Sequence, residues 1–209
     1  MNISEIETPA AVVDLTRLEF NIDRLQKYLD QHGIVNRPHI KTHKIPEIAH
    51  MQLAQGAAGI TCQKLGEAEV MVQAGIRDIL VPYNILGTKK LNRLVLLAKR
   101  ARITLTVDSS VTVSGLSPAA HDNGVSIPVM VEFDTGLHRC GVETPQLAAE
   151  LAVLIDSSPG LQFAGLMTYP LNENTGPFVE EVKKLIEPKG LQVTCVSVGG
   201  TRCMWDAHQ

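Results

Sequence analysis

The 209-residue sequence has no apolar run long enough to cross a bilayer, and its N-terminus lacks a signal-peptide pattern. It also lacks a basic cluster, because its 19 lysines and arginines are scattered among 22 acidic residues, giving a net charge of -3. These absences argue against a membrane protein and against a nucleic-acid-binding surface. With 44% apolar and 20% charged residues, the chain fits one globular domain of the larger kind.

Cysteine and histidine patterns typical of metal sites are also missing. The four cysteines, Cys62, Cys140, Cys195 and Cys203, lie far apart and form no CxxC pair. The seven histidines form no zinc-type pair on one helix face. We therefore expect reduced thiols, a cytoplasmic location, and no metal site within these residues.

What the sequence does contain is a regular alternation of β-branched runs with amphipathic stretches. The predicted strands are Ala11–Leu15, Arg37–Thr42, Gly59–Cys62, Asp78–Tyr83, Ile103–Asp108, Ile127–Phe133, Phe163–Tyr169 and Thr194–Val198. A first predicted helix is capped by Asp14 or Thr16 and runs through Leu29; the others are Pro46–Gln55, Gly66–Ala74, Lys89–Arg100, Ser109–Asn123, Pro145–Ser157 and Pro177–Glu187. Strands that alternate with helices indicate a parallel sheet.

The strand count favours a barrel over an open sheet. Seven β units run from Arg37 to the end, and a (β/α)8 barrel needs eight strands to close. An open doubly wound sheet also accommodates seven. Polar residues follow most strand ends, as in barrel active sites: Lys41, Gln63, Tyr83, Asn84, Asp108, Asp134, Tyr169 and residues 199–201. We predict an α/β fold of the (β/α)8 TIM-barrel type that lacks the eighth strand.

Residues 38–44, PHIKTHK, carry the densest chemical signal, at the end of a predicted strand. Strand alternation would place His39, Lys41 and His43 on one face. A lysine that points into a barrel loses hydration, which favours the free amine needed to form a Schiff base with an aldehyde cofactor. The alternative is a solvated basic strand end.

Two further segments suggest ligand contacts. Ser197, Gly199, Gly200 and Thr201 follow a predicted strand and precede a predicted helix from Arg202 onward, an arrangement that suits phosphate, although a tight turn explains it equally. In residues 132–141, EFDTGLHRCG, the planar cation of Arg139 can hold a phenolate or carboxylate, or form a salt bridge with Asp134 or Glu132. Gln63 and Tyr169 end two predicted strands at the barrel mouth, and Trp205 is expected to be a packing residue.

Taken together, these motifs resemble those of the alanine racemase N-terminal domain superfamily, the fold-type III pyridoxal-phosphate (PLP) enzymes. The nearest resemblance is to the D-threonine aldolase and D-serine dehydratase-like family. The marks are TPAAVVDL at 8–15, RPHIKTHK at 37–44 and TCQKLGEAE at 61–69, followed by residues 134–141 and 197–201. The resemblance runs from about Thr8 to Trp205.

This resemblance implies a role for each candidate site residue. Lys41 would carry PLP, with Lys44 as its rival, and His39 shares the predicted strand face of Lys41. Arg139 would contact the phenolic oxygen of the cofactor. The ring would be lined by Gln63 and Tyr169, and the phosphate would be cradled by Ser197, Gly199, Gly200 and Thr201.

The implied function is that of a PLP-dependent lyase acting on small D-amino acids. The reaction would be retro-aldol cleavage of a β-hydroxy-D-amino acid to glycine and an aldehyde, or dehydration of the D-serine type. A divalent metal is expected only in a C-terminal region beyond this chain. Alternatives are an amino-acid racemase, a non-catalytic single-domain PLP-binding homeostasis protein, and a phosphate-binding barrel enzyme without PLP.

The resemblance also implies a domain organisation and a homodimer. Residues 1–209 would form a truncated PLP-binding barrel domain, in which residues 1–15 contribute a strand to a second, C-terminal β domain. Without strand eight, the first and seventh strands would present unpaired backbone groups, so we expect the chain to fold poorly or to associate with a partner.

Overall fold

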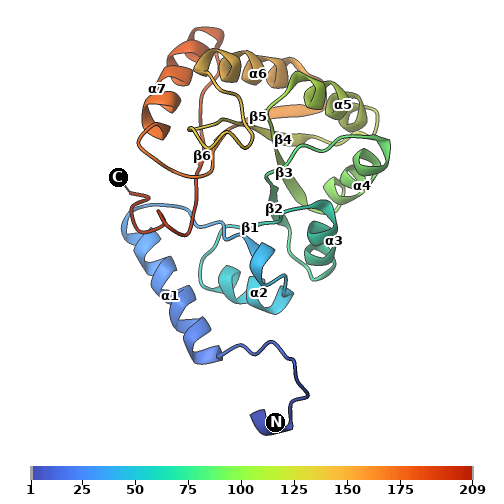
Figure 1. Cartoon of the computed structure of the whole chain (residues 1–209). Coiled ribbons are helices and arrows are strands. Elements are labelled where there is room, and N and C mark those ends of the chain that lie inside the picture. Colours follow the sequence, from blue (N-terminus) through green and yellow to red (C-terminus); the bar gives the residue numbers. More distant parts are fainter. Residues whose placement is uncertain (1, 209) are drawn as a thin grey trace.

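Six parallel strands curve around a common axis, with the helices on the outside, in the computed structural model, which describes residues 2–208 (Figure 1). The strands are β1 (Ile60–Thr61), β2 (Asp78–Val81), β3 (Arg102–Val107), β4 (Ile127–Glu132), β5 (Leu161–Met167) and β6 (Val196–Ser197). Each strand pairs in parallel with the next one along the chain. A doubly wound sheet would reverse its strand order, so the open-sheet alternative was wrong and the fold is a partial barrel.

The helices agree with the sequence-based expectations to within a few residues. They are α1 (Leu15–Gln31), α2 (Pro46–Ala54), α3 (Leu65–Gln73), α4 (Thr88–Ala98), α5 (Ser110–His121), α6 (Pro145–Ser157) and α7 (Thr175–Ile186), with short 3-10 turns at Ile3–Glu5, Ile40–Thr42 and Glu187–Lys189. Side-chain hydrogen bonds to the backbone fix where several of the helices begin. The Asp14 carboxylate accepts the Arg17 N–H at 3.1 Å, and the Thr144 hydroxyl accepts the Leu147 N–H at 3.2 Å. None of the helices in the described residues is long and apolar enough for a membrane span.

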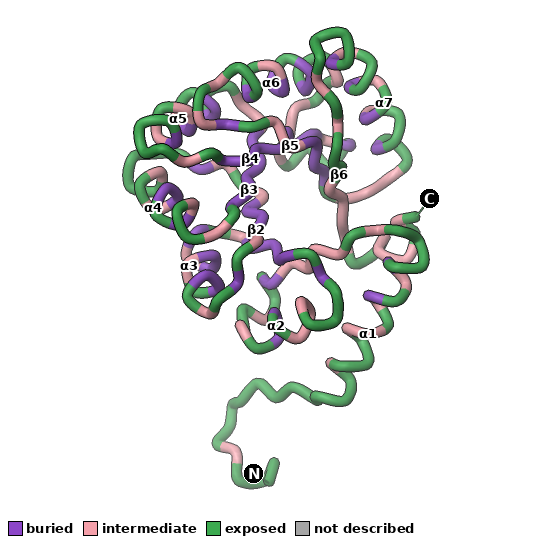
Figure 2. The backbone as a smooth tube through the Cα atoms, turned by 180° about the vertical axis from the view of Figure 1, so that it is seen from behind, coloured by how far each residue is buried: buried purple, intermediate pink, exposed green. Residues whose placement is uncertain are grey.

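Strands β3 and β4 are almost entirely buried, as expected when helices cover one side of the sheet and the barrel interior lies on the other (Figure 2). Alternate side chains such as Val129 and Val131 pack outward in the main hydrophobic core with the helices. A smaller inner cluster consists of Leu80, Met130 and Met167. Successive side chains of a strand point to opposite faces, so these three side chains face the barrel interior, below the strand ends.

The strand predicted at Arg37–Thr42 was wrong, and with it the alternation argument for His39, Lys41 and His43. The segment pairs with the sheet through one bridge, His39 to Thr61, beside which the Thr61 N–H donates to the Pro38 carbonyl at 2.8 Å. Ile40–Thr42 forms a 3-10 turn in which Lys41 is exposed, so the loss of hydration expected for this lysine was also wrong. The cause is local, because the His39 Nδ1 accepts the Lys41 N–H at 3.2 Å and competes with strand pairing.

Two other expected elements are absent. Residues 11–14 are exposed and without regular structure, and α1 begins at Leu15, so the strand predicted at Ala11–Leu15 does not form. A strand requires a neighbour to accept its hydrogen bonds, and its pairing with a second domain stays a prediction. Residues 201–208 form turns instead of the helix predicted from Arg202.

The C-terminal segment packs against α1, at the side where the ring of strands is open (Figure 1). The Trp205 ring lies 5.0 Å from the ring of Tyr28, whose hydroxyl donates to the Trp205 carbonyl. The Arg24 guanidinium lies 4.8 Å from the Trp205 ring centroid. Trp205 is thus a packing residue, as predicted, and side-chain contacts instead of a strand connect the two ends of the partial barrel.

Candidate functional site

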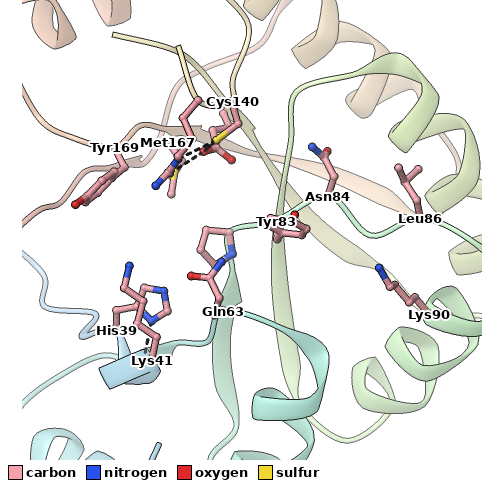
Figure 3. A pocket seen from close by; sticks show the side chains of 13 residues that line it. His39, Lys41, Gln63, Tyr83, Asn84, Leu86, Lys90, Cys140, Met167 and Tyr169 are labelled. Atoms are coloured by element: carbon pink, nitrogen blue, oxygen red, sulfur yellow. Dashed lines mark hydrogen bonds and ion pairs between the residues drawn. The ribbon is translucent and has the colours of Figure 1, made fainter. Parts of the chain in front are cut away.

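A cavity of about 650 Å³ lies at the carboxyl ends of the strands, where the polar strand-end residues were predicted to gather (Figure 3). The segments that line it follow the His39 bridge, β1, β2, β4 and β5. The lining side chains are His39, Lys41, Gln63, Pro82, Tyr83, Asn84, Leu86, Lys90, Glu132, Arg139, Cys140, Met167 and Tyr169. Five of the predicted site residues therefore share one cavity: His39, Lys41, Gln63, Arg139 and Tyr169.

The geometry separates Lys41 from its rival Lys44. The Lys41 Nζ lies 5.7 Å from the centroid of the Tyr169 ring, and its side chain points toward the cavity (Figure 3). Lys44 has a left-handed backbone, with φ of 56°, and its Nζ lies 3.6 Å from the Glu67 carboxylate. The amine of Lys44 is therefore engaged elsewhere, and of these two lysines Lys41 is the one available to a ligand in the cavity, which Lys90 also lines.

His39 contributes a free hydrogen-bonding group to the same wall. Its Nδ1 accepts the Lys41 backbone N–H, so the neutral ring carries its proton on Nε2. That Nε2 is buried and has no partner among the described residues. Burial, and then the charge of Lys41, lower the pKa of His39, which favours the neutral ring. His39 thus presents an unused N–H donor beside the lysine.

Arg139 is held between an acidic group and an aromatic ring. Its guanidinium carbon lies 4.8 Å from the Tyr169 ring centroid, and its Nη2 lies 3.7 Å from Glu132 Oε1. The predicted salt bridge forms with Glu132, and Arg139 lines the cavity; its contact with a phenolate or carboxylate of a ligand stays a prediction. Asp134 has a different task, since its carboxylate accepts the backbone N–H groups of Gly136 and Leu137 at the start of the loop.

Glu132 and Cys140 form a pair that the sequence reasoning missed. The Glu132 side chain is only 5% exposed, and it accepts hydrogen bonds from the Thr106 hydroxyl at 3.0 Å and the Cys140 thiol at 2.9 Å. Burial, together with this carboxylate, raises the pKa of Cys140. The sequence did contain a signal for this pair. Glu132 directly follows the apolar run Val129–Val131, and a charge at the end of a buried strand needs hydrogen-bonding partners.

The predicted phosphate residues lie beside this cavity and do not line it. Ser197 belongs to β6, and the turn that follows it approaches Tyr169, since a Cβ on Gly200 would lie 3.6 Å from the Tyr169 ring. The Gly199 carbonyl accepts the Leu171 N–H at 3.1 Å, and a Cβ on Gly199 would meet nothing within 4 Å. The backbone at Gly199 is therefore open to a ligand, and the phosphate role of Ser197, Gly199, Gly200 and Thr201 stays a prediction.

No group of three or more metal-type side chains comes together within residues 2–208. The cavity instead offers the amines of Lys41 and Lys90, a guanidinium, a neutral imidazole and aromatic rings. This set suits an organic ligand that carries a carbonyl group and anionic oxygens.

A parallel partial barrel with such a cavity at its carboxyl edge defines the class of (β/α)-barrel domains that bind ligands at strand ends. Within this class, the family described as alanine racemase, N-terminal domain, matches residues 13–206. The chain belongs to this family, which confirms the resemblance seen in the sequence.

Several of the similar proteins, and one similar structure, are aldolases. The chain is 43% identical to D-threonine aldolase from Arthrobacter sp. over 167 residues, which cover 80% of this chain and 44% of that protein. It is 35% identical to 3-hydroxy-D-aspartate aldolase from Paracoccus denitrificans (strain Pd 1222) over 217 residues, covering 96% and 56%. The crystal structure of D-threonine aldolase from Filomicrobium marinum superposes with a TM-score of 0.90 at 35% identity, covering 96% and 58%. The chain spans about half the length of the curated relatives it matches.

Proposed function

We propose that this chain is the cofactor-binding barrel part of a PLP-dependent lyase that acts on D-amino acids. The proposal rests on one observation. Lys41 and Arg139 both lie next to the Tyr169 ring, inside a cavity large enough for a cofactor and a small substrate. The named aldolase relatives support a β-hydroxy-D-amino acid as substrate, cleaved to glycine and an aldehyde.

The side chains present fit PLP. Lys41 supplies an amine for the aldehyde carbon, and His39 places a neutral ring beside it. Arg139 supplies a permanent cation for the phenolic oxygen, and Tyr169 an aromatic face beside the ring. The open backbone at Gly199 leaves room for the phosphate. When bound, PLP withdraws electrons from the bond that breaks at the substrate Cα.

Around that chemistry, the residues of the chain bind and orient. Because His39 is kept neutral, it adds no positive charge beside Lys41 and Arg139. Glu132 faces the Arg139 guanidinium from within the barrel and restricts its position. Met167 and Pro82 cover apolar parts of the cavity wall and limit the access of water.

The same proposal extends to the whole protein. In it, the partial barrel is completed to eight strands, residues 1–15 join a C-terminal β domain, and a divalent metal binds in that domain. The whole protein is a cytoplasmic homodimer. The match to about half of each named relative supports a whole protein longer than this chain, and the metal, the homodimer and the location follow from the resemblance seen in the sequence.

The first test concerns the lysine. The purified chain is mixed with PLP, reduced with borohydride and digested, and the modified peptide is located by mass spectrometry. We expect a visible absorbance band that borohydride removes and a label on Lys41; the band should vanish in Lys41→Ala and persist in the matched control Lys44→Ala. A label on Lys44, or no band at all, would overturn the assignment.

The second test concerns the reaction. The whole protein, of which this chain is proposed to be the barrel part, is assayed with D-threonine, 3-hydroxy-D-aspartate and D-serine, each with and without a divalent metal. Release of glycine and an aldehyde is the expected result. Ammonia release would instead identify a dehydratase, and an L-amino acid product would identify a racemase. Stoichiometric PLP binding without turnover would favour the homeostasis-type alternative.

A further inference from the structure

We propose that Asp108, which does not line the cavity, is a positioning residue that holds the Arg139 loop in place. The proposal rests on the proposed function, because Arg139 is the cofactor contact that it positions. Asp108 directly follows β3, and its two carboxylate oxygens have different partners. Oδ1 accepts the side-chain N–H of Asn84 at 2.7 Å, and Oδ2 accepts the backbone N–H of Gly141 at 3.0 Å.

These two partners belong to the loops on either side of β3. Asn84 follows β2 and lines the cavity (Figure 3), and Gly141 comes two residues after Arg139 in the loop that follows β4. Asp108 therefore connects two cavity walls through one side chain. The start of the Arg139 loop is fixed by Asp134, whose carboxylate accepts three successive backbone N–H groups. Asp108 fixes its other end.

The hydrogen-bond pattern requires an acceptor on both sides of residue 108. The Asn84 Oδ1 accepts the hydroxyl of the buried Thr112 at 3.0 Å, so the Asn84 amide nitrogen must face Asp108. Gly141 also presents a donor. A carboxylate satisfies both donors, whereas an asparagine at position 108 has one oxygen and would turn its own N–H groups toward one of them.

This arrangement allows a rescue experiment. Asp108→Asn should weaken PLP binding about tenfold, because one part-buried donor loses its partner. Asn84→Asp should weaken it similarly, because two carboxylates would then face each other. In the double variant, the amide introduced at position 108 can donate to the carboxylate introduced at position 84 and accept from Gly141. The affinity should then return to within about threefold of the original.

A double-mutant cycle separates positioning from a general loss of stability. PLP affinity is titrated by absorbance for Asp108→Asn, Arg139→Gln and the combination. If Asp108 acts through Arg139, Asp108→Asn has little further effect once Arg139 is replaced. Additive effects in this cycle would overturn the proposal. So would a failure of Asn84→Asp to restore PLP affinity when it is combined with Asp108→Asn (the swapped pair). Asp156→Asn on the exposed side of α6 is the matched control and should leave the affinity unchanged.

Hydrogen exchange gives a readout that needs no PLP. In Asp108→Asn, amides of residues 134–143 and 82–86 should exchange about tenfold faster, those of β3 and β4 should be unchanged, and the swapped pair should restore protection. Uniformly faster exchange, or unchanged loops, would contradict the positioning role. If the unaltered chain shows no PLP band, the proposed function fails, whereas the exchange data still decide the role of Asp108.

Discussion

The Lys41 Nζ lies 5.7 Å from the centroid of the Tyr169 ring. Lys41 comes from a 3-10 turn before β1, and Tyr169 directly follows β5, on the opposite side of the partial barrel. The same ring also faces the Arg139 guanidinium, at 4.8 Å. One aromatic ring thus attracts two cations that would otherwise repel each other, and it holds both at the cavity wall.

Replacement of the Tyr169 ring is therefore expected to loosen both cations. In Tyr169→Leu, PLP affinity should fall about tenfold, which corresponds to the loss of roughly 0.5–1 kcal/mol at each of two exposed cation–π contacts. Tyr169→Phe keeps the aromatic face and should stay within about threefold of the original. Absorbance titration of PLP measures both variants. Equal losses in the two would mean that the hydroxyl, and not the ring, is what matters.

The stability of the protein should depend on the protonation of two histidines. Burial lowers the pKa of His39, with a further contribution from the Lys41 charge, and burial also lowers the pKa of His43. The unfolded chain then binds more protons than the folded chain as the pH falls below about 6.5, so the free energy of unfolding should fall there. Above that pH, this contribution to stability is fully present.

Urea unfolding between pH 5 and pH 8 measures this dependence. The slope for one histidine cannot exceed about 1.4 kcal/mol per pH unit, and His39→Gln and His43→Gln should each flatten the curve. If the slope below pH 6.5 survives in both variants, groups other than these two histidines cause it.

The four free cysteines should differ sharply in reactivity. Cys62 is fully buried, and burial together with the Glu67 carboxylate raises its pKa to about 12, whereas Cys195 is exposed. With a thiol reagent at pH 8, we expect Cys62 to react at least about a hundredfold more slowly than Cys195, because the thiolate is the reactive form. Peptide mapping after timed labelling measures the ratio.

Labelling in denaturant and a Cys195→Ser variant are the controls for this experiment. Unfolding should remove the difference, and the serine variant should lose the fast phase only. Fast labelling of Cys62 in the folded protein would contradict the burial of β1.

Gly141 should tolerate no side chain, because it lies against the end of β4. Its φ is +101°, and a Cβ would lie 2.5 Å from the Phe133 carbonyl carbon and 2.7 Å from the Asp134 nitrogen. Gly141→Ala should therefore lower the free energy of unfolding by about 2–4 kcal/mol. Gly136, in the same loop, has φ of +108° with nothing near its Cβ position. Gly136→Ala should cost only about 1 kcal/mol.

Denaturant unfolding compares the two alanine variants directly. The difference between them isolates the steric contact from the backbone preference, since both residues have a positive φ. Equal costs would show that Gly141 is not packed against the strand as described.

The helices and most strands followed from the sequence because local patterns determine them. The continuous apolar run in Ile127–Glu132, the proline at the start of α6 and the Asp14 cap each act over a few residues. The polar residues at strand ends, including Asn84 and Asp108, were expected at one edge of the sheet for the same reason. Parallel strands in chain order bring their carboxyl ends together.

The strand predicted at Arg37–Thr42 failed because a side chain outweighed the pattern. His39 binds the backbone two residues ahead and turns the chain into a 3-10 helix. The lysine nevertheless reaches the cavity, by way of a turn instead of a strand face. Lys41 was thus selected on the basis of a strand alternation that the structure does not contain.

By itself the sequence determined the type and order of the elements, the family, and which residue types are candidates for the site. Only the tertiary structure decided that Lys44 is paired with Glu67, that Glu132 lies buried behind Arg139, and that Asp108 connects two loops. Hydrophobic periodicity and capping act between neighbours in the chain, whereas these contacts join residues that only the curvature of the sheet brings within hydrogen-bonding distance.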